Sequence, residues 1–262
     1  MIRVSVSKNA SIHSTVVIGE GVVIEEGATI GENCRIGHHV VIHRGTQIGE
    51  NVIVGDQTVL GKAPSKAAMS AVTVDKTFAP LQIKSGCVIG ALCVLYCGTV
   101  LADQVFVGDL ASIREEVSIG QRTIIGKGAT VENRTAIGAR CKIETNAYIT
   151  AISRIEDDCF IAPEVTFTND NFLGRTEERK KRFRGVTLKR GARIGANATV
   201  LPGLTIGEDA LLAAGSVLTK DLPPGKIFLG VPARYFGDVP EAQWLRNQTF
   251  FIEKAKEGDE GC

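Results

Sequence analysis

Carboxylate and amide side chains recur at fixed distances in the middle of the chain. Asp109 and Glu115 each lie two residues after an aliphatic residue, and Asn133 follows Glu115 by 18 residues. Thr145 follows Asp109 by 36 residues, and Asn146 is its neighbour. Carboxylates can take a proton from a reacting group, and amides can orient one by hydrogen bonding. The spacing predicts two outer faces, exposed rather than in the core, on which these side chains gather; solubility is the plainer interpretation of each residue taken alone.

A second group of residues is cationic. The segment 168–187 ends in a basic run, in which six positive charges fall within ten positions. Such a run is often only a solvated surface, whereas the functional alternative is a clamp for the phosphates of a nucleotide. The six residues are Arg175, Arg179, Lys180, Lys181, Arg182 and Arg184.

These residues are embedded in a strict period of six. Neither a helix, with period 3.6, nor a strand, with period 2, requires such a period, which is typical of a solenoid with a six-residue unit. Three units of six make one triangular coil of 18 residues, so that stacked coils pair as parallel ladders about 4.8 Å apart. The apolar positions run without a break from Ile83 to Phe167, and the same period holds from Ile12 to Leu60 and from Leu188 to Leu218.

The three periodic stretches contain 9, 15 and 6 apolar positions, and each number is divisible by three. They predict three, five and two whole coils, interrupted by loops at 61–82 and 168–187. If each loop restores the phase, both leave the same corner of the prism, five coils or roughly 24 Å apart. Because loops on a rigid scaffold concentrate function, this corner is the predicted place for a substrate.

The pattern resembles the hexapeptide-repeat family, whose fold is the left-handed parallel β-helix. The left hand is implied by the resemblance alone, because the general rule for parallel crossovers favours the right hand. We therefore expect an all-β protein with a left-handed parallel β-helix of about ten coils over residues 1–222. A C-terminal extension over 223–262, with a short helix near 240–256, is expected to follow.

Two segments make the resemblance more specific. The run from Gly207 to Arg234 is similar to the coenzyme A end of hexapeptide acyltransferases, which implies that Ala196, Ala214, Lys220 and Arg234 contact that cofactor. The segment Ile155–Pro163 with Thr166–Asp170 resembles sugar-nucleotide N-acetyltransferases, which acylate amino sugars. That likeness implies substrate contacts by Glu144, Asn169, Asp170, Arg175, Arg182 and Arg184, and catalytic roles among Asp109, Glu115, Asn133 and Asn146.

The chain departs from those enzymes at Thr145, where they carry Asn, and in its three additional N-terminal coils. The function implied is transfer of an acyl group, most simply acetyl, from acetyl-CoA or another acyl-CoA to the amine of a nucleotide-linked sugar. An O-acyltransferase or an amino-acid N-acyltransferase is the first alternative, for which His39 or His43 would be the base. A non-catalytic or metal-binding trimer is the second.

Histidine and cysteine provide little support for a metal. His38 and His43 have the H-x4-H spacing of the γ-class carbonic anhydrases, but the upstream histidine of that family is replaced by Arg3. Five of the seven cysteines occupy the small inward position of the repeat, where cysteine acts as a small buried apolar residue. They are Cys34, Cys87, Cys93, Cys141 and Cys159.

The composition excludes some partners. The net charge of +1 gives no electrostatic reason to expect nucleic acid or a membrane surface. No apolar run is long enough for a signal peptide or a membrane span, so we expect a cytoplasmic protein. The resemblance implies a homotrimer with its active sites between prisms.

Overall fold

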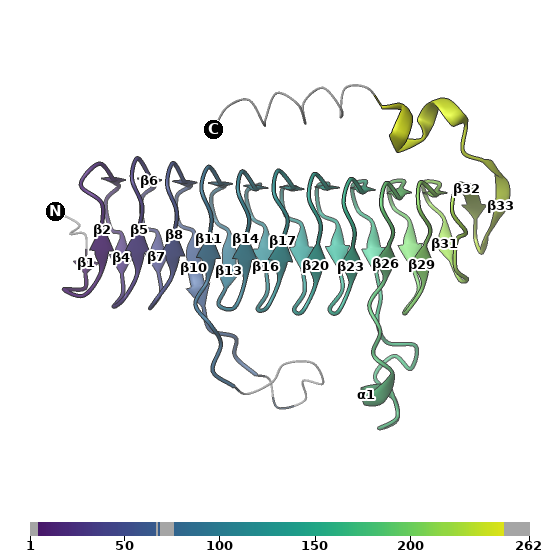
Figure 1. The fold of residues 1–262 in the computed structure, drawn as a ribbon. Coiled ribbons are helices and arrows are strands. Elements are labelled where there is room, and N and C mark those ends of the chain that lie inside the picture. Colours follow the sequence, from purple (N-terminus) through teal and green to yellow (C-terminus); the bar gives the residue numbers. More distant parts are fainter. Residues whose placement is uncertain (1–4, 67, 69–75, 249–262) are drawn as a thin grey trace.

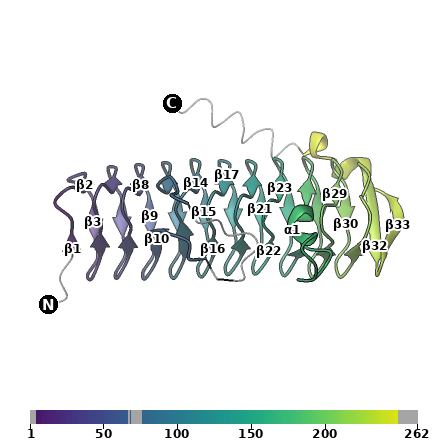
Figure 2. The same cartoon turned by 90° about the horizontal axis from the view of Figure 1, so that it is seen from below.

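The structure is a computed structural model that describes residues 5–66, 68 and 76–248. It is a long parallel β-helix in which short strands stack into three flat faces (Figures 1 and 2). Sheet A contains β1 (Ser5–Val6), β4 (Val23–Ile24), β7 (Val41–Ile42), β10 (Val59–Lys62), β13 (Val94–Tyr96), β16 (Ser112–Ile113), β19 (Thr130–Val131), β22 (Tyr148–Ile149), β25 (Thr166–Phe167), β28 (Thr199–Val200) and β31 (Val217–Leu218).

The other two faces follow the same order along the column. Sheet B contains β2 (Ser11–Ile12), β5 (Thr29–Ile30), β8 (Gln47–Ile48), β11 (Gln82–Ile83), β14 (Val100–Leu101), β17 (Ser118–Ile119), β20 (Ala136–Ile137), β23 (Arg154–Ile155), β26 (Thr187–Leu188) and β29 (Thr205–Ile206). Sheet C contains β3 (Val17–Ile18), β6 (Arg35–Ile36), β9 (Ile53–Val54), β12 (Val88–Ile89), β15 (Phe106–Val107), β18 (Ile124–Ile125), β21 (Lys142–Ile143), β24 (Phe160–Ile161), β27 (Arg193–Ile194), β30 (Leu211–Leu212), β32 (Lys226–Gly230) and β33 (Ala233–Asp238).

The prediction of ten coils is confirmed. The thirty strands from β2 to β31 visit the sheets in the fixed order B, C, A, which gives ten complete coils, and β1 and β32 add partial turns at the two ends. Successive coils pair in parallel with a register of 18 residues, as in Ile113 opposite Val131. This arrangement is an all-β parallel solenoid, consistent with the left-handed form.

The core is a single column inside the prism. Each strand directs its aliphatic residue inward, and the small residue two positions earlier fills the remaining space. The five cysteines predicted to face inward are all buried, which confirms their assignment as core residues. The repeat glycines allow close stacking of the corners: a Cβ on Gly108 would lie 2.7 Å from the backbone nitrogen of Lys127 in the next coil.

Both interrupting loops leave the prism at one corner, as predicted. Loop 1 (63–81) follows β10 and loop 2 (168–186) follows β25, so each connects sheet A to sheet B. In Figure 1 both project on the same side of the column. We call this edge the A–B corner, and name the other edges the B–C and C–A corners. Loop 2 contains the only α-helix among the described residues, α1 (Arg179–Arg182).

The C-terminal part differs from the prediction. β32 extends sheet C parallel to β30, and β33 turns back antiparallel to β32, so pairing continues past residue 222. In place of the expected helix, the described residues form two 3-10 turns, η1 (Glu241–Gln243) and η2 (Leu245–Asn247); the rest of the predicted helix lies outside the described residues. The helix fails there because Trp244 adopts an extended backbone between the two turns.

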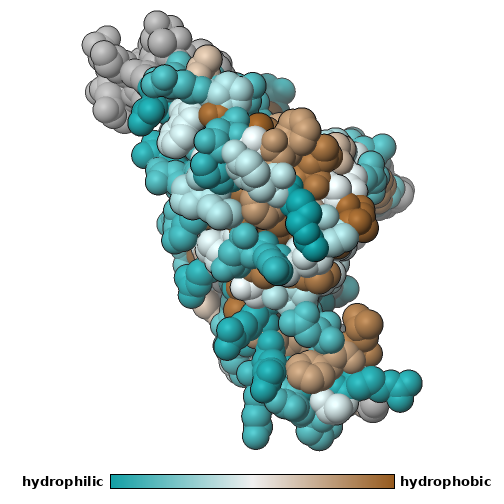
Figure 3. Space-filling view, turned by 90° about the vertical axis from the view of Figure 1, so that its right-hand side faces the viewer, coloured by the Kyte–Doolittle hydropathy of each residue, from teal (hydrophilic) through white to brown (hydrophobic). Residues whose placement is uncertain are grey.

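Figure 3 looks onto this C-terminal end of the column, where apolar residues gather on the surface. Exposed apolar side chains of the β32–β33 hairpin are Leu229, Val231 and Phe236. Within the described ranges, the helices are all too short to cross a lipid bilayer.

Candidate functional site

The A–B corner carries two parallel rows of side chains, most of them polar, between the two loops. The residue directly after each inward aliphatic residue of sheet A points outward, and the next residue lies in the corner. One row therefore runs Tyr96, Arg114, Glu132, Thr150, Thr168, and the other runs Cys97, Glu115, Asn133, Ala151, Asn169. Neighbours within a row lie one coil apart, about 4.8 Å.

Four of these residues form one cluster of hydrogen bonds and ion pairs. Arg114 Nε donates to Glu115 Oε2 at 2.8 Å and Nη2 donates to Oε1 at 3.3 Å, a two-point ion pair. Asn133 Nδ2 donates to the same Glu115 Oε1 at 2.9 Å. Glu132 Oε2 lies 3.8 Å from Arg114 Nη1 on the other side. The cluster has two carboxylates for one guanidinium, so it carries a net negative charge.

The sequence placed Glu115 and Asn133 on the outer surface, and this part of the prediction is wrong. Glu115 is 1% exposed and Asn133 is 3% exposed, and the hydrogen bonds of Glu115 to Arg114 and Asn133 pack these side chains together at the corner. Burying a carboxylate requires partners, and here Arg114 and Asn133 supply them. The structure does bring these two predicted catalytic residues into direct contact.

Glu132 is the member of the cluster best suited to exchange a proton. Burial raises the pKa of its carboxyl above the ordinary value, and the attraction of Arg114 offsets this only in part. Its side chain remains 20% exposed, so that a substrate can reach it. The pKa of the neighbouring Tyr148 is raised as well, mainly by burial and then by the charge of Glu132.

Tyr96 closes the cluster on the side of loop 1. The Arg114 guanidinium lies 4.9 Å from the centre of its ring, and Lys62 Nζ lies 5.5 Å from the same ring. Arg114, Glu132 and Tyr96 were not among the predicted site residues. The spacing of 18 between the opposite charges Arg114 and Glu132 is a signal from which their contact can be predicted.

The other two predicted catalytic residues lie at the C–A corner. Asp109 is exposed, and its Oδ1 accepts a hydrogen bond from the Ala91 backbone nitrogen at 2.8 Å. Asn146 donates to Glu164 at 2.8 Å. Both side chains therefore bridge neighbouring coils, and the structure does not bring them together with Glu115. Glu144, a predicted substrate contact, is half-buried at this same corner.

Three of the six cations of loop 2 form ion pairs with acidic residues of the same loop. Asp170 Oδ2 lies 3.2 Å from Arg179, Glu177 lies 2.6 Å from Lys180, and Glu178 lies 2.6 Å from Arg182. Asp170 also accepts from the backbone nitrogens of Phe172 and Gly174, so it organises the loop. The remaining cations, Arg175, Lys181 and Arg184, are exposed, and none has an ion-pair partner among the described residues. Asn169 lies at the base of the loop in the corner row.

The residues matched to the coenzyme A end fall at two corners and on β33. Ala196 and Ala214 stack one coil apart at the C–A corner, in the column that also contains Ala91 and Asp109. Lys220 is exposed in the corner row of the A–B corner. Arg234 is exposed on β33, where its Nη1 donates to the Ala233 carbonyl at 2.9 Å.

A pocket of about 770 Å³ lies at the base of loop 1. Its floor is formed by Val41, Val59 and Val94, which point outward from sheet A one residue before the inward aliphatic residue of each strand. At its edge His43 Nδ1 lies 3.2 Å from Glu25 Oε1, and these two residues lie one coil apart, each directly after an inward aliphatic residue. Since a carboxylate on one imidazole nitrogen orients the other, this pair has the form of a general-base dyad.

The histidine spacing that suggests zinc is not matched by the geometry. His38 lies at the C–A corner, where its Nδ1 accepts from the Glu20 backbone nitrogen at 3.0 Å, whereas His43 lies at the A–B corner. Across the described part of the chain, histidine, cysteine and acidic side chains form no group of three or more arranged to hold a metal ion.

Sequence comparison finds two hexapeptide models in this chain. The model "Bacterial transferase hexapeptide (six repeats)" matches residues 27–62, and "Hexapeptide repeat of succinyl-transferase" matches 116–151 and 189–220. The curated relatives include the bifunctional protein GlmU of Rubrobacter xylanophilus, 49% identical over 53 residues, which are 20% of this chain and 11% of that protein. Galactoside O-acetyltransferase of Escherichia coli is 33% identical over 71 residues, which are 27% of this chain and 33% of that protein.

Structure comparison supports the same fold. An N-acyltransferase from Bacillus cereus, AntD, solved with dTDP and coenzyme A, is 21% identical with a TM-score of 0.52. The likeness covers 63% of this chain and 93% of that one. The two matching models identify hexapeptide repeats over residues 27–62, 116–151 and 189–220, and the parallel solenoid agrees with them. The chain spans only 11% and 33% of the length of the two curated relatives described above.

Proposed function

We propose that the protein transfers an acyl group from a coenzyme A thioester to the amino group of a nucleotide-linked amino sugar. The observation that carries this proposal is the cluster of Arg114, Glu115, Glu132 and Asn133 between two loops on one corner. Its excess negative charge favours an acceptor that arrives as an ammonium ion. A neutral hydroxyl would leave that charge uncompensated.

In this reaction we assign Glu132 the role of general base. The ammonium group of the acceptor gives one proton to the Glu132 carboxylate, and the neutral nitrogen attacks the thioester carbonyl carbon. A C–N bond forms as the C–S bond breaks, and the coenzyme A thiolate leaves and takes up the second proton of the nitrogen. The products are an amide, free thiol and the proton held by Glu132, which returns to solvent. A carboxyl group with a raised pKa is the better match to this task.

The two substrates would approach from different directions. Loop 2 leaves the solenoid two coils beyond Glu132, about 10 Å away, so Arg175 and Arg184 would hold the diphosphate while the sugar reaches the cluster. The small side chains of Ala196 and Ala214 leave room for the thin pantetheine arm, and Lys220 and Arg234 are the cations for its phosphates. Asn169 and Asp170 would shape the base of loop 2, and Glu144, Asn146 and Asp109 would line the C–A side. We expect three copies to assemble, with each site between two prisms.

The direct test is release of thiol. The protein is mixed with acetyl-CoA and a panel of nucleotide sugars with the amine at C3 or C4, each matched with its hydroxyl counterpart. We expect thiol release only with amino sugars. If none of the amino sugars causes thiol release, the proposal is contradicted. Failure of coenzyme A to raise the melting temperature would favour a non-catalytic scaffold.

Transfer to a hydroxyl group is the second candidate, because the His43–Glu25 pair borders a pocket of about 770 Å³. Acylation of a hydroxyl needs a general base, and an imidazole oriented by a carboxylate can act as one. A double variant His39→Asn, His43→Asn separates the candidates: it loses O-acylation but keeps N-acylation. Since His39 and His43 lie outside the Glu115 cluster, unchanged amine acylation in this variant supports the first candidate.

A further inference from the structure

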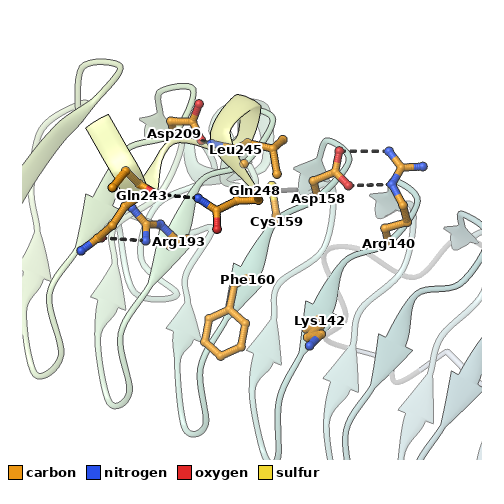
Figure 4. Close-up of a pocket in the computed structure, with 12 residues that line it drawn as sticks. Arg140, Lys142, Asp158, Cys159, Phe160, Arg193, Asp209, Gln243, Leu245 and Gln248 are labelled. Atoms are coloured by element: carbon orange, nitrogen blue, oxygen red, sulfur yellow. Dashed lines mark hydrogen bonds and ion pairs between the residues drawn. The ribbon is translucent and has the colours of Figure 1, made fainter. Parts of the chain in front are cut away.

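A second cavity lies on sheet C, away from the A–B corner. The segment 240–248, which we call the strap, crosses the outer face of this sheet and encloses a cavity of about 260 Å³ (Figure 4). The strap is fastened at two points: Leu245 N donates to Asp209 Oδ1 at 3.0 Å, and Arg193 Nη1 donates to Gln243 Oε1 at 3.1 Å. Trp244 belongs to the strap, and its indole nitrogen donates to the Val239 carbonyl at 3.1 Å.

Arg193 lies on β27 and lines this cavity, and only part of its guanidinium group is hydrogen-bonded. Its Nε and Nη2 atoms are out of contact with solvent and have no hydrogen-bond acceptor in the described part of the chain. Burial lowers the pKa of Arg193, and the attraction of Asp209 offsets this only in part. Nε and Nη2 form the side edge of the guanidinium, whose two parallel N–H groups match the two oxygens of a carboxylate or phosphate group.

The rest of the cavity wall fits the same chemistry. Lys142, Phe160 and Arg193 point outward from three successive coils, so that an aromatic ring lies between two cations. Lys142 is exposed, and its ammonium group makes no ion pair with any described residue. The acidic Asp158 is already held by Arg140 at 2.6 Å and Arg190 at 3.0 Å. A bound anion would therefore face donors that have no other acceptor.

We propose that this cavity binds a small organic oxyanion, a carboxylate or a phosphate ester with an apolar body that packs on Phe160. The oxyanion would occupy the side edge of Arg193 and lie within reach of Lys142. Figure 4 shows Gln243 and Gln248 next to Arg193, so entry requires these side chains to turn aside. None of the cavity residues belongs to the proposed acyl-transfer site, and the strap couples ligand binding to the C-terminal segment.

Trp244 allows a direct test, because it is the only tryptophan of the chain and lies within the strap. Its fluorescence is followed while inorganic phosphate, phenyl phosphate, butyrate or phenylacetate is added, with sodium chloride at matched ionic strength as the blank. We expect a saturable change with at least one organic anion, weakened about tenfold or more by Arg193→Gln or Lys142→Gln. The control Arg35→Gln removes another outward arginine of sheet C, on β6, and is expected to bind as the unaltered protein does.

Stability provides a second readout. Because Arg193 is half-buried and two of its nitrogens have no hydrogen-bond acceptor among the described residues, Arg193→Gln is expected to melt no lower than the unaltered protein without ligand, and to lose the rise in melting temperature that the anion causes. The proposal is overturned if no organic anion gives a saturable change, or if Arg193→Gln responds as the unaltered protein does. A response to inorganic phosphate that equals the response to phenyl phosphate would identify a general anion site and contradict the role of Phe160.

Discussion

Asn133 donates a hydrogen bond of 2.9 Å to Glu115 from the next coil of the solenoid. The two residues are 18 positions apart, and both lie nine-tenths or more buried at the corner that carries the two loops. The repeat thus converts a spacing in the sequence into a contact between a carboxylate and an amide. Arg114 adds the cation that makes burial of Glu115 tolerable.

Asn133→Asp tests the energetic importance of this contact. A second carboxylate would replace the donor beside Glu115, and we expect the free energy of unfolding to fall by about 3 kcal/mol at neutral pH. Asn146→Asp is the matched control, because Asn146 makes the same kind of bond to Glu164 on the exposed C–A corner. The loss of unfolding free energy in Asn146→Asp should stay below about 1 kcal/mol. If urea unfolding shows equal losses of unfolding free energy in the two variants, the contact between Asn133 and Glu115 is no more important than the exposed one.

Glu132 predicts an unusual pH dependence of stability. Its pKa is raised in the folded protein, so the folded state holds this proton at pH values where the unfolded state has lost it. The contribution of Glu132 to stability therefore falls as the pH rises through the interval between the unfolded and the folded pKa. Glu132→Gln removes the titration, and it should melt higher than the unaltered protein at pH 7.5, with the difference vanishing near pH 4. Melting curves at several pH values check this, and a difference that grows toward acid would refute it.

The rate of acyl transfer should depend on the same carboxylate. Glu132→Gln keeps the shape but cannot take a proton, so we expect kcat to fall about 100-fold with little change in the KM for acetyl-CoA. The limb of the pH–rate profile that falls toward acid should disappear in the variant. Glu156→Gln changes a carboxylate that pairs with Lys189 at the B–C corner, and it should leave kcat unchanged.

Loop 2 offers a comparison between cations in ion pairs and cations without them. Arg175→Gln and Arg184→Gln should each raise the KM for the nucleotide sugar about tenfold, because a charge-assisted contact to phosphate is lost. Arg182→Gln removes an arginine that already pairs with Glu178 at 2.6 Å, and its effect should be smaller. The increase should shrink at high salt. If Arg182 proves the most sensitive of the three, the diphosphate has another position.

A large side chain should block the arm of coenzyme A. Ala214 is exposed, so Ala214→Trp should fold normally and raise the KM for acetyl-CoA tenfold or more by filling the space next to Ala196. Ala91→Trp is the control in the same C–A column, five coils before Ala196. Initial rates at varied acetyl-CoA provide the measurement. An unchanged KM in Ala214→Trp would remove the cofactor from this column.

The sequence predicted the architecture because one physical constraint repeats throughout it. A triangular coil admits one aliphatic residue per side, so the three periodic stretches together determined the number of coils, and the fifteen positions from Ile83 to Phe167 determined the shared corner of both loops. Burial at the corners could not be predicted in this way, because the period does not say which polar corner residue is buried. Glu115 was therefore assigned to the surface although Arg114 and Asn133 enclose it.

The ion pairs of loop 2 and the strap over sheet C also escaped prediction, and for a different reason. Arg182 and Glu178 meet within an irregular segment, and Arg193 meets Gln243 over a separation of 50 residues. Neither contact follows from the repeat. The expected C-terminal helix failed at Trp244, whose extended backbone separates two short turns.

The most direct test of the central claim is the chemical nature of the product. A nucleotide-linked amino sugar is incubated with acetyl-CoA and the protein, and the acetylated product is treated with neutral hydroxylamine, which cleaves esters and spares amides. We predict one acetyl group per acceptor, resistant to hydroxylamine, and its near-absence with Glu132→Gln. A hydroxylamine-labile product, or equal yield from Glu132→Gln, would contradict amine acylation at the Glu115 cluster.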